Sequence, residues 1–388
     1  MPSLDDFARS KLTNLEARGQ RRDLTVTRRG LAGAAQRDGH EVISFCCNDY
    51  LNLSQHPDVK QAAMRAVETE GAGTGASRLV TGNSPLFVQL ENKLAELKGT
   101  QAALVFGSGY MANMGIIPSL VSAGDLVLAD ELSHACLVSG SRLSGARFHT
   151  FRHNDMADLE SHLVRLRAQA RNALIVTDGV FSMDGDLAPL PQLAALARAH
   201  DAWLMTDDAH GLGVVGGGRG SSFAFGADKM DVPLQMGTLS KAVGGYGGYL
   251  CASQPVIDLL KSRARTLVYS TGLPPASIAA ASAALTIIAG NKSLVEKPVA
   301  NAAQFCSEAG LPVPQSPIVP VLIGDERAAL QASHILFNEG FLVTAIRPPT
   351  VPAGTARLRL TFMAEHTAAD ISRLAKIIRE QIIRRPAA

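Results

Sequence analysis

The sequence predicts an α/β fold in which a mostly parallel central sheet is flanked by helices, with a smaller α+β domain at the C-terminal end. Two observations predict the sheet. From about residue 100, short apolar runs alternate with longer stretches of helical spacing, as in parallel sheets covered by helices on both faces. Polar and glycine-rich clusters follow these runs, and functional groups gather at the carboxyl ends of such strands. The smaller domain is indicated by a change of composition near residue 291, after which proline-rich turns appear.

The composition is that of an ordinary globular protein that acts on small molecules. The 388 residues are 46% apolar and 19% charged, enough for a large domain and a smaller one. The formal charge of +2 and the lack of a concentrated basic run argue against nucleic acid or a membrane as partner. The five cysteines form no CxxC pair and no metal spacing, so we expect buried thiols and no metal. Residues 1–20 are charged without an apolar core, so we expect a cytoplasmic protein.

The first fifty residues are predicted to form a separate N-terminal segment. Apolar residues at helical spacing predict a helix over 4–18, followed by Arg21 and Arg22. A strand is expected over 41–45, before a polar and aromatic turn at 47–51.

The large α/β domain is predicted over 51–291. Helices are expected over 57–70 and 84–97, separated by a glycine-rich loop that lacks the lysine of a nucleotide-binding P-loop. Strands are predicted at 102–106, 126–129, 148–151, 173–177, 203–207, 234–237 and 248–252. Helices are predicted up to residue 120 and over 134–143, 159–166 and 278–289. The last of these is apolar but too short to span a bilayer, so we expect a buried helix.

The small C-terminal α+β domain is predicted over 292–388. Proline-rich turns precede a strand over 318–322, which is followed by a helix over 328–339. A strand over 357–361 and a helix over 368–384 complete the domain.

Two stretches predict pyridoxal phosphate chemistry: residues 237–242, which contain Lys241, and residues 207–210, which end a strand. A lysine amine can hold an aldehyde cofactor covalently as a Schiff base. The pyridine ring accepts electrons only while its nitrogen is protonated, which requires a carboxylate beside it. Asp207 is placed for that role, and His210 could bond the phenolic oxygen. Taken alone, Lys241 would be an exposed lysine in a glycine-rich turn.

Two further motifs lie between predicted strands and helices. The amides of Ser108, Gly109 and Tyr110 precede a helix, where the helix dipole can help to bind a phosphate; an ordinary turn is the alternative. His134 follows Ser133 at the next helix start, where it could cap the helix or stack on the cofactor ring.

Residues 177–186, together with 207–211 and the Lys241 loop, resemble the α-oxoamine synthases, and the resemblance covers nearly the whole chain. These fold-type I pyridoxal phosphate transferases condense an amino acid with an acyl thioester. Within this family, residues 347–359 resemble the members that join L-alanine to a pimeloyl thioester in biotin biosynthesis. The acyl carrier, coenzyme A or acyl carrier protein, stays open, as does chain-length tolerance.

The resemblance implies roles for individual residues. Lys241 would be the Schiff-base lysine and, with His134, Asp207 and His210, would form the catalytic set. Cofactor contacts are implied for Gly109, Tyr110, His134, Ser182, Asp207, His210, Thr238, Lys241, Ser270 and Thr271. Of these, Ser270 and Thr271 would reach the phosphate of a neighbouring subunit, which implies an obligate homodimer.

Substrate contacts are also implied by the resemblance. Arg359 would bind the amino-acid carboxylate, with His134 and Asn48 nearby. Thr350 and one arginine of the N-terminal pair, Arg22 rather than Arg21, would face the acyl substrate. The chain departs from the family at residue 178, where many members have glutamate. The shorter side chain of Asp178 changes the reach of a polar contact.

Other functions stay open at this point. The protein could be a related synthase that uses glycine or serine, of the 2-amino-3-ketobutyrate ligase, 5-aminolevulinate synthase or serine palmitoyltransferase type. It could also be a non-catalytic relative that keeps the fold, although such relatives typically lose the lysine that this chain retains as Lys241. An aminotransferase or decarboxylase of the same fold is disfavoured by residues 347–359.

Overall fold

The computed structural model describes residues 3–18, 20–226 and 229–383. The chain divides into two compact units, each of which combines segments that are distant in sequence. The first unit comprises Met1–Cys46 and Pro320–Leu360, and the second comprises Cys47–Val319 and Thr361–Ala388. The two units are defined differently from the three predicted segments, whose boundaries lie at residues 50 and 291. The division into three segments stays a prediction.

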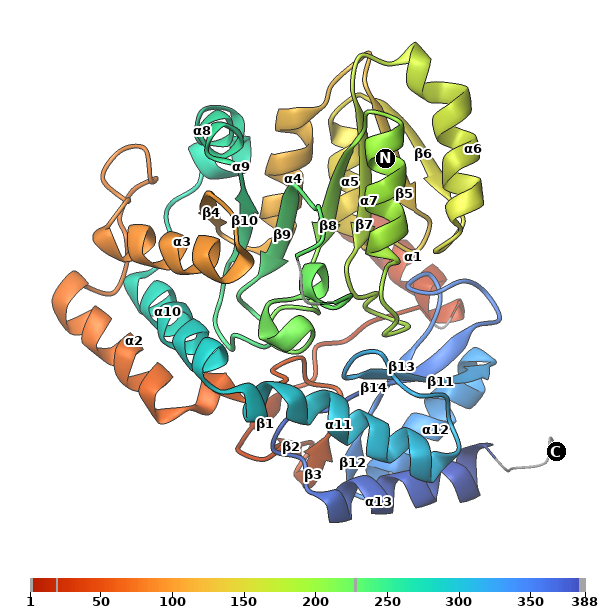
Figure 1. Ribbon diagram of the computed structural model, residues 1–388. Helices are drawn as coiled ribbons and strands as arrows, with labels where there is room; N and C mark the ends of the chain where they lie inside the picture. Colours follow the sequence, from red (N-terminus) through yellow and green to blue (C-terminus); the bar gives the residue numbers. More distant parts are fainter. Residues whose placement is uncertain (1–2, 19, 227–228, 384–388) are drawn as a thin grey trace. The chain divides into compact units, whose positions relative to one another are not determined.

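The second unit contains a seven-stranded sheet in the order β4-β10-β9-β8-β7-β5-β6 (Figure 1). Its strands are β4 (Ala102–Phe106), β5 (Leu126–Asp130), β6 (Arg147–Phe151), β7 (Ala173–Asp178), β8 (Trp203–Asp207), β9 (Leu234–Thr238) and β10 (Gly248–Ala252). β10 runs antiparallel to both its neighbours, and the other pairs are parallel. The predicted mostly parallel sheet is therefore confirmed, and it contains each of the seven strands predicted between residues 102 and 252.

Helices cover both faces of this sheet, which explains the continuous apolar runs of its strands. Alternate residues of β4 enter different cores. Ala103 and Val105 pack in a cluster with residues of α3 (Pro85–Lys98) and α10 (Pro275–Gly290). Leu104 and Phe106 instead pack with residues of α4 (Gly109–Leu120) and α8 (Gln254–Arg263). The helices of this unit are α2 (Pro57–Glu70), α3 (Pro85–Lys98), α4 (Gly109–Leu120), α5 (Ala135–Leu143), α6 (Met156–Leu166), α7 (Leu190–Ala199), α8 (Gln254–Arg263), α9 (Arg265–Val268), α10 (Pro275–Gly290), α11 (Lys292–Ala309) and α13 (Ala368–Ile377).

The first unit has two small sheets. Strands β1 (Thr27–Arg29), β2 (Ala34–Arg37), β3 (His40–Ser44) and β12 (Phe341–Leu342) form one sheet. The other sheet has the order β11-β14-β13, with β11 (Ile318–Gly324), β13 (Thr344–Ile346) and β14 (Ala356–Thr361). Helix α12 (Glu326–Asn338) belongs to this unit, as does α1 (Leu4–Ala17), which starts with a Ser3–Asp6 capping box.

The C-terminal region differs from the sequence prediction in two helices. Residues 292–309 were expected to open a proline-rich region but form α11, which contains Pro298 and is capped by the Asn291 side chain. The predicted helix over 368–384 is α-helical only to Ile377 and continues as a π-helix over Ile378–Ile383; residue 384 lies outside the described residues. The expected buried helix is α10, with Ile278, Leu285 and Ile288 in the core.

Within the described residues, no single helix is long and apolar enough to cross a membrane. Helices α10 and α11 pass the length and composition test only as a pair, and the pair is bent by 82°.

Candidate active site

The amine of Lys241 meets a histidine at the carboxyl edge of the seven-stranded sheet. Lys241 lies three residues after β9, and its Nζ is 2.7 Å from Nε2 of His210, which follows β8. The turn after the lysine is closed by hydrogen bonds from Gly244 N to Lys241 O and from Gly245 N to Leu239 O. Gly244 has a φ of +71° and lies against the Leu53–Ser54 backbone, where a Cβ atom would clash. The chain therefore fixes the lysine within reach of His210.

His210 is held on its other side by a tyrosine. Its Nδ1 is 2.7 Å from the hydroxyl oxygen of Tyr50, and both residues are buried. The Tyr50 hydroxyl also lies 3.4 Å from Oδ1 of Asn48, to which it can donate. The sequence placed Tyr50 in a turn without giving it a role, although a tyrosine beside a predicted site residue could have indicated one. Contacts at both nitrogens fix the orientation of the His210 ring.

Asp207 is a buried carboxylate at the end of β8. Its Oδ2 accepts a 2.7 Å hydrogen bond from Nδ2 of Asn113, and its Oδ1 accepts one from the backbone of Ala209. Asn113 lies on α4 and is fully buried. Sequence reasoning missed this residue, although a lone amide in an otherwise apolar helix was a usable signal. Asn113 fixes the carboxylate that was predicted to meet the pyridine nitrogen.

His134 caps α5 and is tied to β7. Its Nδ1 accepts a 3.3 Å hydrogen bond from Cys136 N, and its own backbone N–H donates to Oδ2 of Asp178 over 2.8 Å. Burial lowers the pKa of His134 and Lys241 lowers it further, against the opposing effect of Asp207. The ring is therefore neutral at pH 7. Cap and cofactor roles were alternatives in the sequence, and the cap is confirmed without excluding stacking.

Two acidic groups beside His134 have raised pKa values. Burial, reinforced by the nearby Asp207 carboxylate, raises the pKa of Asp178 well above its usual range. Burial likewise raises the pKa of the Cys136 thiol to about 12. Cys136 is therefore an uncharged thiol. Burial was expected for all five cysteines; Cys136, Cys251 and Cys306 are buried, whereas Cys46 and Cys47 are half-buried. At this position, where many family members have glutamate, the Asp178 carboxylate accepts its hydrogen bond from the His134 backbone N–H.

The predicted phosphate-binding residues converge at the start of α4. Ser108 is the N-cap and accepts a hydrogen bond from Met111 N over 3.1 Å, and Gly109 and Tyr110 begin the helix. A Cβ atom built on Gly109 would lie 3.4 Å from Cβ of Thr238. The Thr238 hydroxyl is 2.8 Å from Ser240 Oγ and donates to Gly247 O. First-turn amides have no carbonyl partner within their helix, and the dipole favours an anion there.

Three other predicted cofactor residues lie in turns of the same unit. Ser182 is in a half-buried turn that a hydrogen bond from Phe181 N to Asp186 O closes. Ser270 is half-buried, and Thr271 is exposed and forms an isolated antiparallel bridge with Ser77. Their predicted reach to a neighbouring subunit stays a prediction.

The predicted substrate residues of the first unit fall into a contacting pair and a separate arginine. Nη2 of Arg22 donates to the hydroxyl of Thr350 over 3.2 Å. Both residues line a cavity of about 250 Å³ with Gln20 and residues 344–349. Arg21 instead pairs with Glu16 and Asp23. Arg359 is buried on β14, opposite Thr344.

The groups of the second unit fit pyridoxal phosphate by their chemistry. A buried carboxylate suits a protonated pyridine nitrogen, and an imidazole suits a phenolic oxygen. The amine of Lys241 is 2.7 Å from that imidazole, and a helix N-terminus suits the phosphate. Each part of the cofactor thus has a group of matching charge or hydrogen-bonding capacity.

Comparison with known proteins places this arrangement in a family. The model of the family described as aminotransferase class I and II matches residues 40–378. The chain is 60% identical over 378 residues to 8-amino-7-oxononanoate synthase from Beijerinckia indica, covering 97% of this chain and 98% of the relative. It is 64% identical to the synthase of that name from Methylocella silvestris, over 89% of this chain and 98% of the relative.

Solved structures are similar over nearly the same length. Serine palmitoyltransferase from Sphingomonas wittichii superposes with a TM-score of 0.90 at 32% identity, covering 96% of each chain. The 8-amino-7-oxononanoate synthase of Francisella tularensis superposes with a TM-score of 0.75 at 27% identity, covering 88% of this chain and 98% of that one. A serine palmitoyltransferase structure at 32% identity was solved with pyridoxal phosphate joined to the enzyme. By its family model and its relatives, this chain belongs to the aminotransferase class I and II family and, within it, to the 8-amino-7-oxononanoate synthases.

Proposed function

We propose that this protein is a pyridoxal phosphate-dependent acyltransferase of biotin biosynthesis. It condenses L-alanine with a pimeloyl thioester and releases 8-amino-7-oxononanoate, CO₂ and a free thiol. The observation that carries the proposal is the convergence of Lys241, His210 and Asp207, with Lys241 Nζ 2.7 Å from His210 Nε2, in a chain 60–64% identical to synthases of that name.

The cofactor, when bound, supplies an aldehyde that takes up amines and a protonated ring that accepts the electrons released at the amino-acid Cα. The Asp207 carboxylate, fixed by Asn113, would accept a hydrogen bond from the pyridine N–H. His210, oriented by Tyr50, would bond the phenolic oxygen. Gly109, Tyr110 and Thr238 would hold the phosphate, and Ser182 would line the pocket. The His134 ring would stack on the cofactor, because a flat uncharged imidazole loses little hydration on burial.

Lys241 has the second task of moving the proton at Cα of L-alanine. Its amine removes this proton as general base, and His210 at 2.7 Å keeps Nζ oriented. A carbon–carbon bond then forms between Cα and the thioester carbonyl carbon, and the carbon–sulfur bond breaks as the thiol leaves. The alanine carboxylate departs as CO₂, and Cα receives a proton in its place.

The substrate contacts extend the proposal to the first unit. By the family resemblance, Arg359 would supply a guanidinium for the alanine carboxylate, and Asn48 is a second residue implied for this substrate. Arg22 and Thr350, joined over 3.2 Å at the cavity of about 250 Å³, would bind the terminal carboxylate of the pimeloyl chain. Arg22 is preferred to Arg21 because Arg21 already pairs with two carboxylates.

A serine palmitoyltransferase type of reaction is the second candidate, because those structures superpose with the higher TM-score of 0.90. Backbone similarity, however, reports the fold more than the substrate. Identity of 60–64% to the synthases against 32% to serine palmitoyltransferase therefore favours L-alanine and the pimeloyl thioester.

Assembly and location are part of the proposal. We infer a homodimer in which Ser270 and Thr271 of one subunit complete the phosphate site of the other, which accords with the exposure of Thr271. Coenzyme A and acyl carrier protein are both candidate acyl carriers, and the cytoplasm is the expected compartment.

The test is thiol release by the purified protein with pyridoxal phosphate. L-alanine with pimeloyl-CoA is compared with glycine or serine and acetyl-, succinyl- or palmitoyl-CoA. We expect the alanine and pimeloyl pair to dominate, and we expect Lys241→Ala to abolish turnover while the surface control Lys261→Ala does not. Dominance of another pair would reassign the substrate, and steady turnover by Lys241→Ala would overturn the catalytic assignment.

A further inference from the structure

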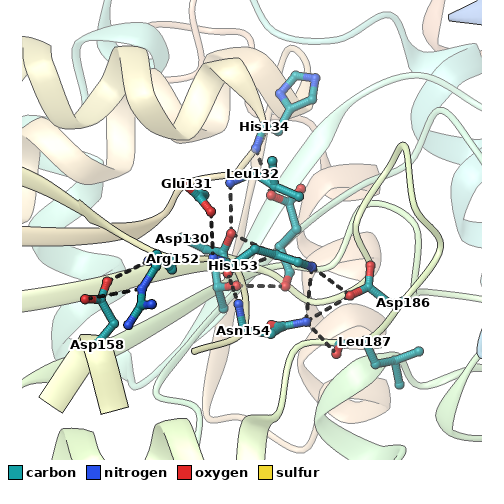
Figure 2. Close-up of polar contacts among 12 residues, drawn as sticks. Asp130, Glu131, Leu132, His134, Arg152, His153, Asn154, Asp158, Asp186 and Leu187 are labelled. Atoms are coloured by element: carbon teal, nitrogen blue, oxygen red, sulfur yellow. Dashed lines mark hydrogen bonds and ion pairs between the residues drawn. The ribbon is translucent and has the colours of Figure 1, made fainter. Parts of the chain in front are cut away.

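A second cluster of charged groups lies beside the candidate active site. Asp130 ends β5, His153 follows β6, and Asp186 lies between β7 and α7. Figure 2 shows the His153 ring between the two carboxylates. Its Nδ1 is 3.0 Å from Oδ1 of Asp130, and its Nε2 is 2.8 Å from Oδ2 of Asp186. The ring therefore connects the end of β5 with the segments that follow β6 and β7, the two strands that pair with β5.

The geometry favours a positively charged ring. An ionised carboxylate only accepts hydrogen bonds, so a ring that donates to both Asp130 and Asp186 carries a proton on each nitrogen. Burial alone would lower the pKa of His153, but the two hydrogen bonds outweigh it and raise the pKa to about 10. The ring also packs edge-on against Phe181, with centroids 4.4 Å apart. His153 is thus an imidazolium fixed on three sides.

The contacts of His153 with Asp130 and Asp186 form a bridge between two segments. Its Asp130 end belongs to the loop that carries His134. Oδ1 of Asp130 accepts a hydrogen bond from Leu132 N over 2.9 Å, and its Oδ2 accepts one from Asn154 N over 2.8 Å. The backbone N–H of His153 donates to Oε1 of the adjacent Glu131 over 3.0 Å. The residues that lead from β5 to His134 are therefore bonded to the turn after β6.

The Asp186 end of the bridge belongs to the turn that carries Ser182. Oδ2 of Asp186 accepts from both His153 and Nδ2 of Asn154, the latter over 2.9 Å. The backbone carbonyl of Asp186 accepts from Phe181 N over 3.0 Å, which closes the turn around Ser182. Asp186 therefore connects this turn to both His153 and Asn154.

We propose that His153 is a positioning residue of the active site, whose imidazolium holds the His134 loop and the Ser182 turn in register through Asp130 and Asp186. This inference rests on the proposed function, because it assigns His134 and Ser182 to the cofactor site. His153 acts through the two loops and takes no part in the bond changes. Without the cation, Asp130 and Asp186 face each other as like charges, and both loops shift.

The test compares three variants of the full-length protein. His153→Gln removes the cation, and Asp186→Asn keeps an oxygen that can accept from the ring. Arg152→Gln is the matched control, because this neighbouring arginine pairs with Asp155 and Asp158 in its own turn. The readouts are kcat, the KM of each substrate, the visible circular dichroism of bound pyridoxal phosphate, and amide hydrogen exchange of the apoprotein.

For His153→Gln we expect kcat to fall on the order of tenfold and the KM for L-alanine to rise about threefold, because small displacements of positioning groups are costly. The KM for pimeloyl-CoA should change by less than about twofold, since the thioester is bound elsewhere. The circular dichroism band of the cofactor should change, and peptides over 130–135 and 181–187 should exchange faster. Asp186→Asn should show the same pattern more weakly, and Arg152→Gln should match the wild type.

The outcomes separate this inference from the proposed function. Wild-type kinetics and an unchanged cofactor band in His153→Gln would overturn the positioning role, as would an equal loss in Arg152→Gln. If His153→Gln does not fold, Asp186→Asn decides by the same readouts. If the wild type releases no thiol with alanine and pimeloyl-CoA, the proposed function fails, whereas exchange of the two loops in the apoprotein still tests the bridge.

Discussion

Two histidines near the candidate active site carry different charges at neutral pH because of their neighbours. Burial near Lys241 lowers the pKa of His134, whereas two carboxylates raise that of His153 to about 10 despite its burial. The groups that face His153 are Asp130 and Glu131 at the end of β5 and Asp186 after β7. Charge on a histidine is thus set by contacts between segments, which sequence spacing does not reveal.

This contrast predicts how stability depends on pH. Because folding raises the pKa of His153 from about 6.5 to about 10, its charge stabilises the folded state fully below pH 6.5, and this contribution is lost as the pH rises through about 10. The free energy of unfolding of the wild type should therefore exceed that of His153→Gln most at pH 6, and the difference should shrink steadily up to pH 10.5. Urea unfolding at five pH values measures it; a difference that grows with pH would contradict the assignment of charge.

At this same scale, the sequence could predict residues that act through local motifs. Lys241, Asp207 and His210 were recognisable because each lies in a distinctive string at or just after the end of a strand. The structure brings Lys241 and His210 together. Tyr50 and Asn113 gave only weak local signals, because they meet their partners across 160 and 94 residues of sequence. Only the folded sheet brings such residues into contact.

At the scale of elements, a buried ion pair ties the end of α3 to the loop after β8. Lys98 Nζ donates to Oδ2 of Asp208 over 2.7 Å and to Arg219 O over 2.6 Å, and both charged side chains are fully buried. Asp208 also accepts from Ser221 N over 3.0 Å. Asp208 directly follows Asp207, so this pair supports the loop that carries the proposed pyridine partner.

Removing one member of the pair leaves a buried charge without its partner. Lys98→Met should therefore lower the free energy of unfolding by about 3–5 kcal/mol, measured by urea denaturation, whereas the double variant Lys98→Met with Asp208→Leu should recover part of this loss. Lys292→Met is the control. Lys292 is exposed and pairs loosely with Glu296, so its replacement should change the free energy of unfolding little. Equal effects of the two single lysine variants would contradict the importance of burial.

The elements themselves were largely predictable, since the strands of a covered sheet are continuous apolar runs. Helices α7 and α8 were not predicted, and the small β1–β2 hairpin and α11 were missed for physical reasons. The hairpin is polar and has few buried residues, so it lacks a clear period of two. Helix α11 contains Pro298, which usually indicates a helix boundary.

At the scale of the whole molecule, the proposed homodimer makes each active site depend on two chains. If Ser270 and Thr271 complete the partner's phosphate site, two defective chains can restore one another. A Lys241→Ala chain keeps both hydroxyls, and a Ser270→Ala/Thr271→Ala chain keeps the lysine. In a mixed dimer, one of the two sites then contains the lysine of one chain and the hydroxyls of the other.

Co-expression of the two variants should therefore restore activity that neither has alone at limiting pyridoxal phosphate. Random pairing makes half the dimers mixed, each with one intact site, so about a quarter of the wild-type turnover is expected. If the hydroxyls instead served their own chain, both sites of a mixed dimer would be defective and no activity would return. Because the two chains differ only at these positions, restored turnover together with a dimeric mass in sedimentation identifies sites shared between subunits.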